Sequence, residues 1–173
     1  MIPLGVLASA RVEAAGGAAL LYATTASAVI SVGGWSLVGA ATMLEAITSD
    51  DDATSYASGT SIPGGPLVLQ LPAISIAAGA TIASVTVHTR RSASTASSSA
   101  FAAALKVNGT FYSAAAGTMR SVAWEDVEAV WTTNPATSTA WTPAEVATIT
   151  EIRLSTTDST PPPRISFVEL RIA

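Results

Sequence analysis

The stretch that decides the fold reads Val130-Trp131-Thr132-Thr133-Asn134-Pro135, and Ala140-Trp141-Thr142-Pro143-Ala144-Glu145-Val146 follows a few residues later. Two tryptophans bracket an Asn-Pro turn. Thr142 and Glu145 have the spacing of a capping box, and Pro143 stands at the first helical position, where its missing N–H costs nothing. The stretch therefore predicts a β-strand, a turn, a short helix and then another strand.

The rest of the chain carries the period-2 patterns of β-strands. From residue 82 to 90, Ala83, Val85 and Val87 alternate with Ser84, Thr86 and His88, which indicates one buried face and one wetter face. Asn108-Gly109 between two apolar runs favours a hairpin with a type I′ turn. Strands are expected over residues 67–71, 82–90, 101–107, 110–112, 127–132, 149–156 and 164–172, and Thr42-Met43-Leu44-Glu45 predicts another short helix.

These elements predict an all-β protein. An antiparallel β-sandwich of the jelly-roll type with two short helices is the preferred topology, and an immunoglobulin-like sandwich is the alternative. Residues 1–34 are expected to form an extended N-terminal arm and a hairpin between residues 19–24 and 28–32, and residues 35–173 to form the sandwich domain. The apolar start of the arm either docks on another subunit or packs on the domain's own surface.

Composition disfavours several classes of protein. Charged residues make up 12% of the 173 residues, the formal net charge is −4, and only Arg90-Arg91 are adjacent basic residues. A nucleic-acid partner needs a clustered basic face, so none is expected. The longest apolar run is far shorter than the ~20 residues of a spanning helix, so no membrane partner is expected either. The chain has no cysteine, and its start lacks the basic region of a secretory signal.

The sequence shows no combination of residues that is typical of a catalytic site. His88 is the only histidine, and no nucleophile or orienting acid accompanies it. Glu125, Asp126 and Glu128 could imitate the paired carboxylates of a glycoside hydrolase, but Glu125 and Asp126 should point to opposite faces of an extended chain. We therefore expect a non-enzymatic protein without catalytic residues.

No cofactor or metal site is expected. Asp50-Asp51-Asp52 is the best candidate for an ion site, since a hard cation such as Ca²⁺ takes several oxygen ligands from one loop. Three consecutive acids cannot all point at one ion, which favours a solvated acidic loop. Residues 62–66 are glycine- and proline-rich but lack the Lys-Ser/Thr ending of a phosphate-binding loop.

Four tryptophans are the bulky residues of a chain rich in small side chains. Exposed aromatic rings bind sugars by stacking, so a carbohydrate-binding module is an alternative function, with Trp124 as its test residue. More often such residues anchor a core or an interface. Trp131 and Trp141, which flank the turn and the helix cap, are interpreted as packing residues; Trp35 is the fourth.

A set of spaced motifs runs along the chain. They are Pro3 to Arg11, Gly34-Trp35, Leu44-Glu45-Ala46-Ile47 with Asp50 to Tyr56, Trp131 with Asn134-Pro135, and Trp141-Thr142 with Glu145-Val146. This pattern resembles a β-sandwich domain widespread in the virion proteins of tailed bacteriophages, which a final strand of alternating apolar residues closes. The chain departs from the pattern after Ile152, where Arg153-Leu154-Ser155 replaces a glycine-containing strand.

The resemblance implies a structural component of the virion, either a minor tail protein or a capsid decoration protein. It implies assembly in the cytoplasm of the bacterial host, with capsid or tail subunits and further copies of the same chain as partners. The family offers no catalytic residues to transfer. A host-surface adhesion module that binds a glycan remains the alternative.

Overall fold

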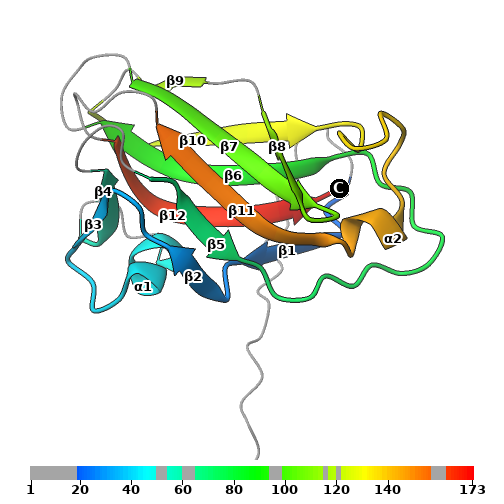
Figure 1. Cartoon of the computed structure of the whole chain (residues 1–173), viewed down its shortest axis with the longest axis horizontal. Helices are drawn as coiled ribbons and strands as arrows, with labels where there is room; N and C mark the ends of the chain where they lie inside the picture. The colour runs from blue at the N-terminus through cyan, green and yellow to red at the C-terminus, as the bar shows by residue number, and fades with distance from the viewer. Residues whose placement is uncertain are drawn as a thin grey trace, which may run out of the picture.

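The computed structural model describes residues 19–49, 54–59, 65–93, 99–114, 117–119, 122–156 and 163–173. Two antiparallel sheets form a β-sandwich, and two short helices lie at opposite ends of it (Figure 1). The predicted all-β sandwich is confirmed. The first 18 residues of the predicted N-terminal arm lie outside the described residues.

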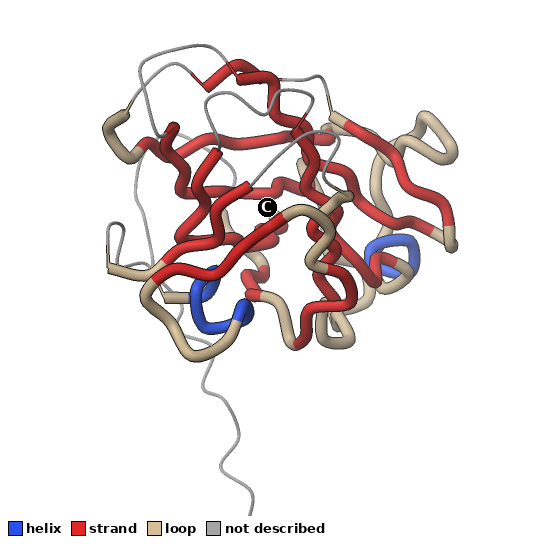
Figure 2. The backbone as a smooth tube through the Cα atoms, turned by 60° about the vertical axis from the view of Figure 1, so that its left-hand side comes forward, coloured by secondary structure: helices blue, strands red, loops and turns tan. Residues whose placement is uncertain are grey.

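Sheet A has six strands in the order β10-β6-β12-β4-β3, with β1 on a separate part of β12. The strands are β1 (Tyr22–Thr25), β3 (Trp35–Val38), β4 (Tyr56–Gly59), β6 (Val85–Ala93), β10 (Glu125–Trp131) and β12 (Pro163–Ile172). The last strand, β12, is central: it pairs with β6 on one side, and with β4 and β1 on the other. Helix α1 (Met43–Thr48) packs against β12 and β4, and Figure 2 shows both helices at the periphery of the strands.

Sheet B has six strands in the order β2-β5-β11-β7-β8, with β9 also paired to β7. The strands are β2 (Ala28–Ser31), β5 (Leu67–Gln70), β7 (Ser99–Val107), β8 (Thr110–Ser113), β9 (Gly117–Met119) and β11 (Ile149–Thr156). From β5 to β12 the chain passes back and forth between the two sheets, with β8 and β9 added beside β7. This wrapping is the jelly-roll arrangement.

The first two strands correct one prediction. β1 and β2 do not pair with each other to form a hairpin: β1 pairs with β12 in sheet A, and β2 pairs with β5 in sheet B. Only Ala26 and Ser27 separate them, and a two-residue hairpin turn favours Asn, Asp or Gly, which take positive φ. Both segments instead add to longer strands, and Ala26 is buried between the sheets.

The core consists of the inward side chains of both sheets. The large side chains that are fully buried are Ile47, Leu67, Leu69, Val85, Leu105, Ile149, Ile152, Leu154, Ile165, Leu170 and Ile172. Trp131 and Trp141 are also buried, and the Trp141 indole N–H donates to the Trp131 carbonyl oxygen at 3.0 Å. Their predicted packing role is confirmed.

Local signals in the sequence give the expected turns and caps. At α2 (Pro143–Val146) the Thr142 hydroxyl accepts from the Glu145 N–H, and the Glu145 carboxylate accepts from the Thr142 N–H at 2.9 Å. These hydrogen bonds with Thr142 lower the pKa of Glu145. Asn108 and Gly109 have φ of 48° and 81°, as a type I′ turn requires. All of these predictions are confirmed.

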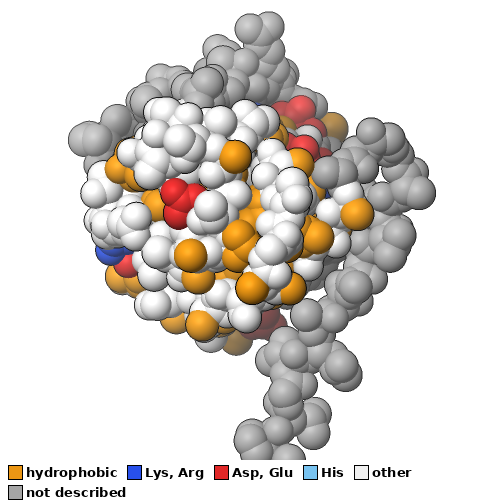
Figure 3. Space-filling view, turned by 90° about the vertical axis from the view of Figure 1, so that its right-hand side faces the viewer, with side chains coloured by type: hydrophobic (Ala, Val, Ile, Leu, Met, Phe, Trp, Pro, Cys, Tyr) orange, Lys and Arg blue, Asp and Glu red, His pale blue; other side chains and the backbone are white. Residues whose placement is uncertain are grey.

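The face at the end of the sandwich near α2 is sparsely charged. Figure 3 shows mainly uncharged polar and backbone atoms there, with scattered apolar side chains. Among the described residues, no helix is both long and apolar enough to cross a bilayer.

Candidate functional site

The outer face of sheet A, which points away from sheet B, carries charged and aromatic side chains in aligned rows. Register pairing across β10, β6 and β12 sets three rows: Asp126, Arg90 and Phe167; Glu128, His88 and Glu169; and Val130, Thr86 and Arg171. The alternate residues of β6 and β12, such as Val87 and Leu170, point into the core. Neighbouring strands therefore hold these rows in fixed positions.

A bulge in β12 places Phe167 on this outer face. The pairing of β12 with β6 shifts register between Ile165 and Phe167, and Ser166 occupies the extra position. Ile165 and Val168 consequently both point inward, whereas Phe167 packs edge-on against His88 with ring centroids 6.1 Å apart. Phe167 therefore does not share the inward, apolar face of this strand with Ile165 and Val168.

Opposite charges pair along the rows. The Arg90 guanidinium lies 3.0 Å from the Asp126 carboxylate, and Arg171 lies 2.7 Å from Glu169 and 3.4 Å from Glu128. Ion pairs that solvent reaches contribute only about 0–1 kcal/mol each to stability, and each of these pairs is partly accessible. Their larger effect is to orient carboxylate and guanidinium groups toward one surface, where they can hydrogen-bond a ligand.

His88 lies under this charged layer and is only 7% exposed, so the predicted wetter face of β6 is in fact largely covered. Its Nε2 lies 3.2 Å from the Asp126 carboxylate. Burial and the nearby Arg171 lower the pKa of His88, and they outweigh the opposing effect of Asp126, whose side chain is 54% exposed and therefore screened. His88 is thus uncharged at neutral pH and acts as a packing residue beside Phe167.

An aromatic pair extends the same face. Tyr56, the first residue of β4, and Trp124, directly before β10, meet edge to face with ring centroids 5.8 Å apart. The Arg164 guanidinium lies 5.3 Å from the centre of the Tyr56 ring. Both rings are half-buried, so each keeps part of its surface accessible. Trp124 precedes Asp126 by two residues, which puts the aromatic pair next to the charged rows.

The outer face of sheet B offers less aromatic surface. Its Phe111 ring lies between two cations, with Arg153 4.5 Å and Lys106 5.5 Å from the ring centre. Lys106 is in turn paired with Glu151. The outer face of sheet A carries the rings of Tyr56, Trp124 and Phe167, and we therefore regard it as the better candidate.

The acidic residues that could imitate a glycoside hydrolase do not form a pair. Within β10, Glu125 points toward Arg91 on the inner face of sheet A, and its Oε1 lies 3.9 Å from the Arg91 Nε. Asp126 points to the outer face, where it contacts Arg90 and His88. The two carboxylates therefore do not flank a common groove.

The remaining candidates from the sequence, for sugar binding and for an ion site, do not lie on this face among the described residues. Trp35 is buried in the core. Asp50, Asp51 and Asp52 lie outside the described residues, and the part of the chain that is described holds no group of three potential metal-ligating side chains.

The sequence interpretation missed Tyr56, Arg164 and Phe167 as residues of the candidate site. Only the broken alternation at Ile165-Ser166-Phe167-Val168 could have indicated one of them.

Comparisons with solved structures found partial similarities at low sequence identity. No protein-family model and no curated protein matches the chain. The CBM22-1 xylan-binding domain of Paenibacillus barcinonensis Xyn10C has a TM-score of 0.48 at 12% identity, covering 92% of this chain and 97% of that domain. CBM35 from the same organism has a TM-score of 0.44 at 13% identity, covering 88% and 98% of the two chains. The CBM22-1-GH10 modules of Clostridium thermocellum xylanase 10B have a TM-score of 0.48 at 13% identity, covering 88% of this chain and 28% of that one.

Proposed function

We propose that the chain is a non-enzymatic, glycan-binding β-sandwich whose binding surface is the outer face of sheet A. The observation that carries this proposal is the edge-to-face pair of Tyr56 and Trp124 beside the Asp126–Arg90 ion pair. Sugar rings combine C–H faces, which pack on aromatic rings, with hydroxyl groups, which hydrogen-bond to carboxylate and guanidinium groups. Rigid strands hold both kinds of group ready for a ligand, which lowers the entropic cost of binding.

The charge on this face favours a neutral glycan. Its described residues include three carboxylates (Asp126, Glu128 and Glu169) and three guanidinium groups (Arg90, Arg164 and Arg171). Because these charges balance and His88 is neutral, the face should neither strongly attract nor repel a charged sugar. An uncharged polysaccharide is therefore the class of ligand that we assign.

Replacing Trp124 with alanine is expected to weaken glycan binding by about 2 kcal/mol, or roughly 30-fold, as for a central aromatic contact. Isothermal titration calorimetry with a neutral polysaccharide, selected from a glycan array probed with the unmodified chain, measures the change. Trp124→Phe should keep part of the affinity, because it keeps an aromatic ring.

Phe111→Ala provides the matched control for this experiment. It removes an aromatic ring from the outer face of the opposite sheet and should leave glycan affinity unchanged. Equal losses for Trp124→Ala and Phe111→Ala would contradict the assignment of the face. A glycan array on which the unmodified chain binds nothing would contradict the function itself.

The second candidate function is a structural subunit of a tailed-phage virion that docks on capsid or tail subunits and on copies of itself. Its support is a set of exposed apolar side chains at the two edge strands β2 and β3: Ile30 is 51%, Val32 44%, Leu37 38% and Val38 36% exposed. Exposed apolar edge strands can pair with another chain.

Ile30→Lys combined with Leu37→Lys is expected to abolish association between copies of the chain, as measured by sedimentation velocity. Val130→Lys is the control, since Val130 is 49% exposed on a different edge strand, β10. If the unmodified chain sediments as a monomer and is absent from the proteins of purified virus particles, the virion role is contradicted.

A further inference from the structure

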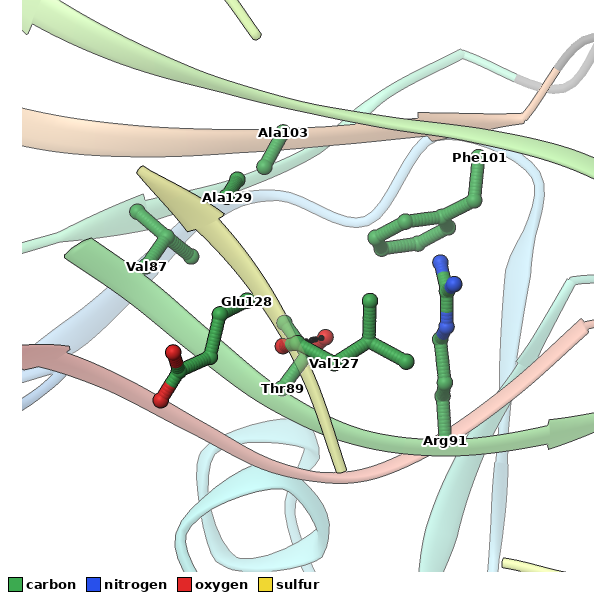
Figure 4. Close-up of a pocket in the computed structure, with 8 residues that line it drawn as sticks. All are labelled: Val87, Thr89, Arg91, Phe101, Ala103, Val127, Glu128 and Ala129. Carbon is green, nitrogen blue, oxygen red and sulfur yellow. Dashed lines mark hydrogen bonds between the residues drawn. The ribbon is translucent and has the colours of Figure 1, made fainter. Parts of the chain in front are cut away.

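A small pocket lies between the two sheets beneath the edge strand β10 (Figure 4). Its volume is about 50 Å³, and Val87, Thr89, Arg91, Phe101, Ala103, Val127, Glu128 and Ala129 line it. Most of these side chains are apolar. Figure 4 shows the Arg91 guanidinium beside the Phe101 ring, while the Glu128 carboxylate points away from both. A single cation is therefore placed in a mostly apolar pocket.

Arg91 is buried, and the ion pair that the structure gives it, with Glu125, is long. Its side chain is 3% exposed, and its guanidinium carbon lies 4.9 Å from the centre of the Phe101 ring. The Glu125 carboxylate is 3.9 Å from Nε, beyond hydrogen-bond distance, and is itself 38% exposed. Nε has no hydrogen-bond partner among the residues that the structure describes.

A hydrogen-bond acceptor placed beside the buried Arg91 guanidinium would stabilise it. Burial lowers the pKa of Arg91, but a guanidinium group stays protonated in proteins. A buried N–H donor such as the Arg91 Nε, which lacks a hydrogen bond, is costly, and the contact with Phe101 compensates for only part of that cost. The planar fork of N–H donors matches the two oxygens of a carboxylate. A volume of about 50 Å³ exceeds the space of one water molecule and accommodates a carboxylate group.

We propose that this pocket binds a carboxylate group, which Arg91 contacts directly while Phe101 and Val127 keep water away. The exposed Glu125 side chain competes for the same cation and turns outward when the ligand enters. The site does not rest on the glycan proposal, because it lies on the inner side of sheet A. A free small carboxylic acid and a sugar acid share the required chemistry.

Nuclear magnetic resonance of the arginine Nε–H groups in the ¹⁵N-labelled chain tests the proposal. Sodium acetate, added at constant ionic strength against sodium chloride, should shift the Arg91 resonance in a saturable way. Acetamide has the same shape without the charge and should not shift it. Glucuronate acting at lower concentration than acetate would identify a sugar acid as the source; equal effects would identify the isolated carboxylate.

Two variants complete the test. Arg91→Met keeps a long apolar side chain and should weaken acetate binding about tenfold or more, whereas Glu125→Gln removes the competing carboxylate and should strengthen it. The proposal is overturned if the Arg91 resonance responds to neither acetate nor glucuronate, or if Arg91→Met binds acetate as the unmodified chain does. If Arg91→Met fails to fold, the titration of the unmodified chain still decides.

Discussion

Trp141→Ala is expected to lower the free energy of unfolding by about 3–5 kcal/mol, the usual cost of removing a buried tryptophan. Trp141 is 3% exposed, and its indole N–H donates to the Trp131 carbonyl oxygen at the end of β10. The substitution leaves a cavity beside α2 and also removes the donor for a buried carbonyl group, so the two losses add. Urea denaturation followed by far-ultraviolet circular dichroism measures the change without relying on tryptophan fluorescence.

Trp141→Phe separates the two contributions. It keeps most of the apolar volume but removes the hydrogen bond, so it should cost only about 1–2 kcal/mol. If Trp141→Ala and Trp141→Phe were equally destabilising, packing around the ring would contribute little. That result would contradict the role assigned to the residue.

Gly39→Ala is expected to destabilise the fold by about 2–4 kcal/mol, since it adds a side chain where backbone geometry forbids one. Gly39 has φ of +76°, and a Cβ atom there would lie 1.7 Å from the Thr54 carbonyl oxygen. Backbone must therefore move. Because Thr54 precedes Tyr56 by two residues, the shift should also disturb the Tyr56–Trp124 pair and weaken glycan binding. Denaturation and calorimetry measure the two effects.

Gly79→Ala is the matched control for the position. Gly79 also has a positive φ, +84°, but an added Cβ would meet no atom within 4 Å. Gly79→Ala should lower the free energy of unfolding by only about 1 kcal/mol, the cost of holding alanine at a positive φ, and should leave glycan binding unchanged. Equal costs for the two alanines would show that the contact between residue 39 and Thr54 is unimportant.

Features that depend only on residues close together in the sequence could be predicted from it. The capping box at Thr142 and Glu145 and the turn at Asn108-Gly109 are local hydrogen-bond and dihedral preferences, so they formed as expected. The alternating pattern of strands also gave the sandwich. Strand partners could not be predicted, because β1 pairs with β12 across almost the whole described chain.

The candidate site depends on such distant pairings. Tyr56 and Trp124 are 68 positions apart in the sequence. They meet because β4 and β10 belong to one sheet, in which β6 and β12 lie between them. A one-residue bulge at Ser166 decides that Phe167 points outward. The consecutive apolar residues Phe167 and Val168 break the alternation there, but they do not show which of the two turns outward. Arg90 and Arg91 are adjacent in the sequence, whereas the strand sends their side chains to opposite faces of the sheet.

The position of β12 has a consequence for how the molecule reaches its native state. Tyr22 lies opposite Ile172, and β12 also joins β6 and β4. Bringing such distant strands together lowers the conformational entropy of the chain before the stabilising contacts between them have formed. Chains with this topology therefore fold in milliseconds to seconds rather than in microseconds. Until β12 inserts, β1 has no strand partner and β6 and β4 each have one unpaired edge. During that interval the polypeptide is most vulnerable to aggregation and proteolysis.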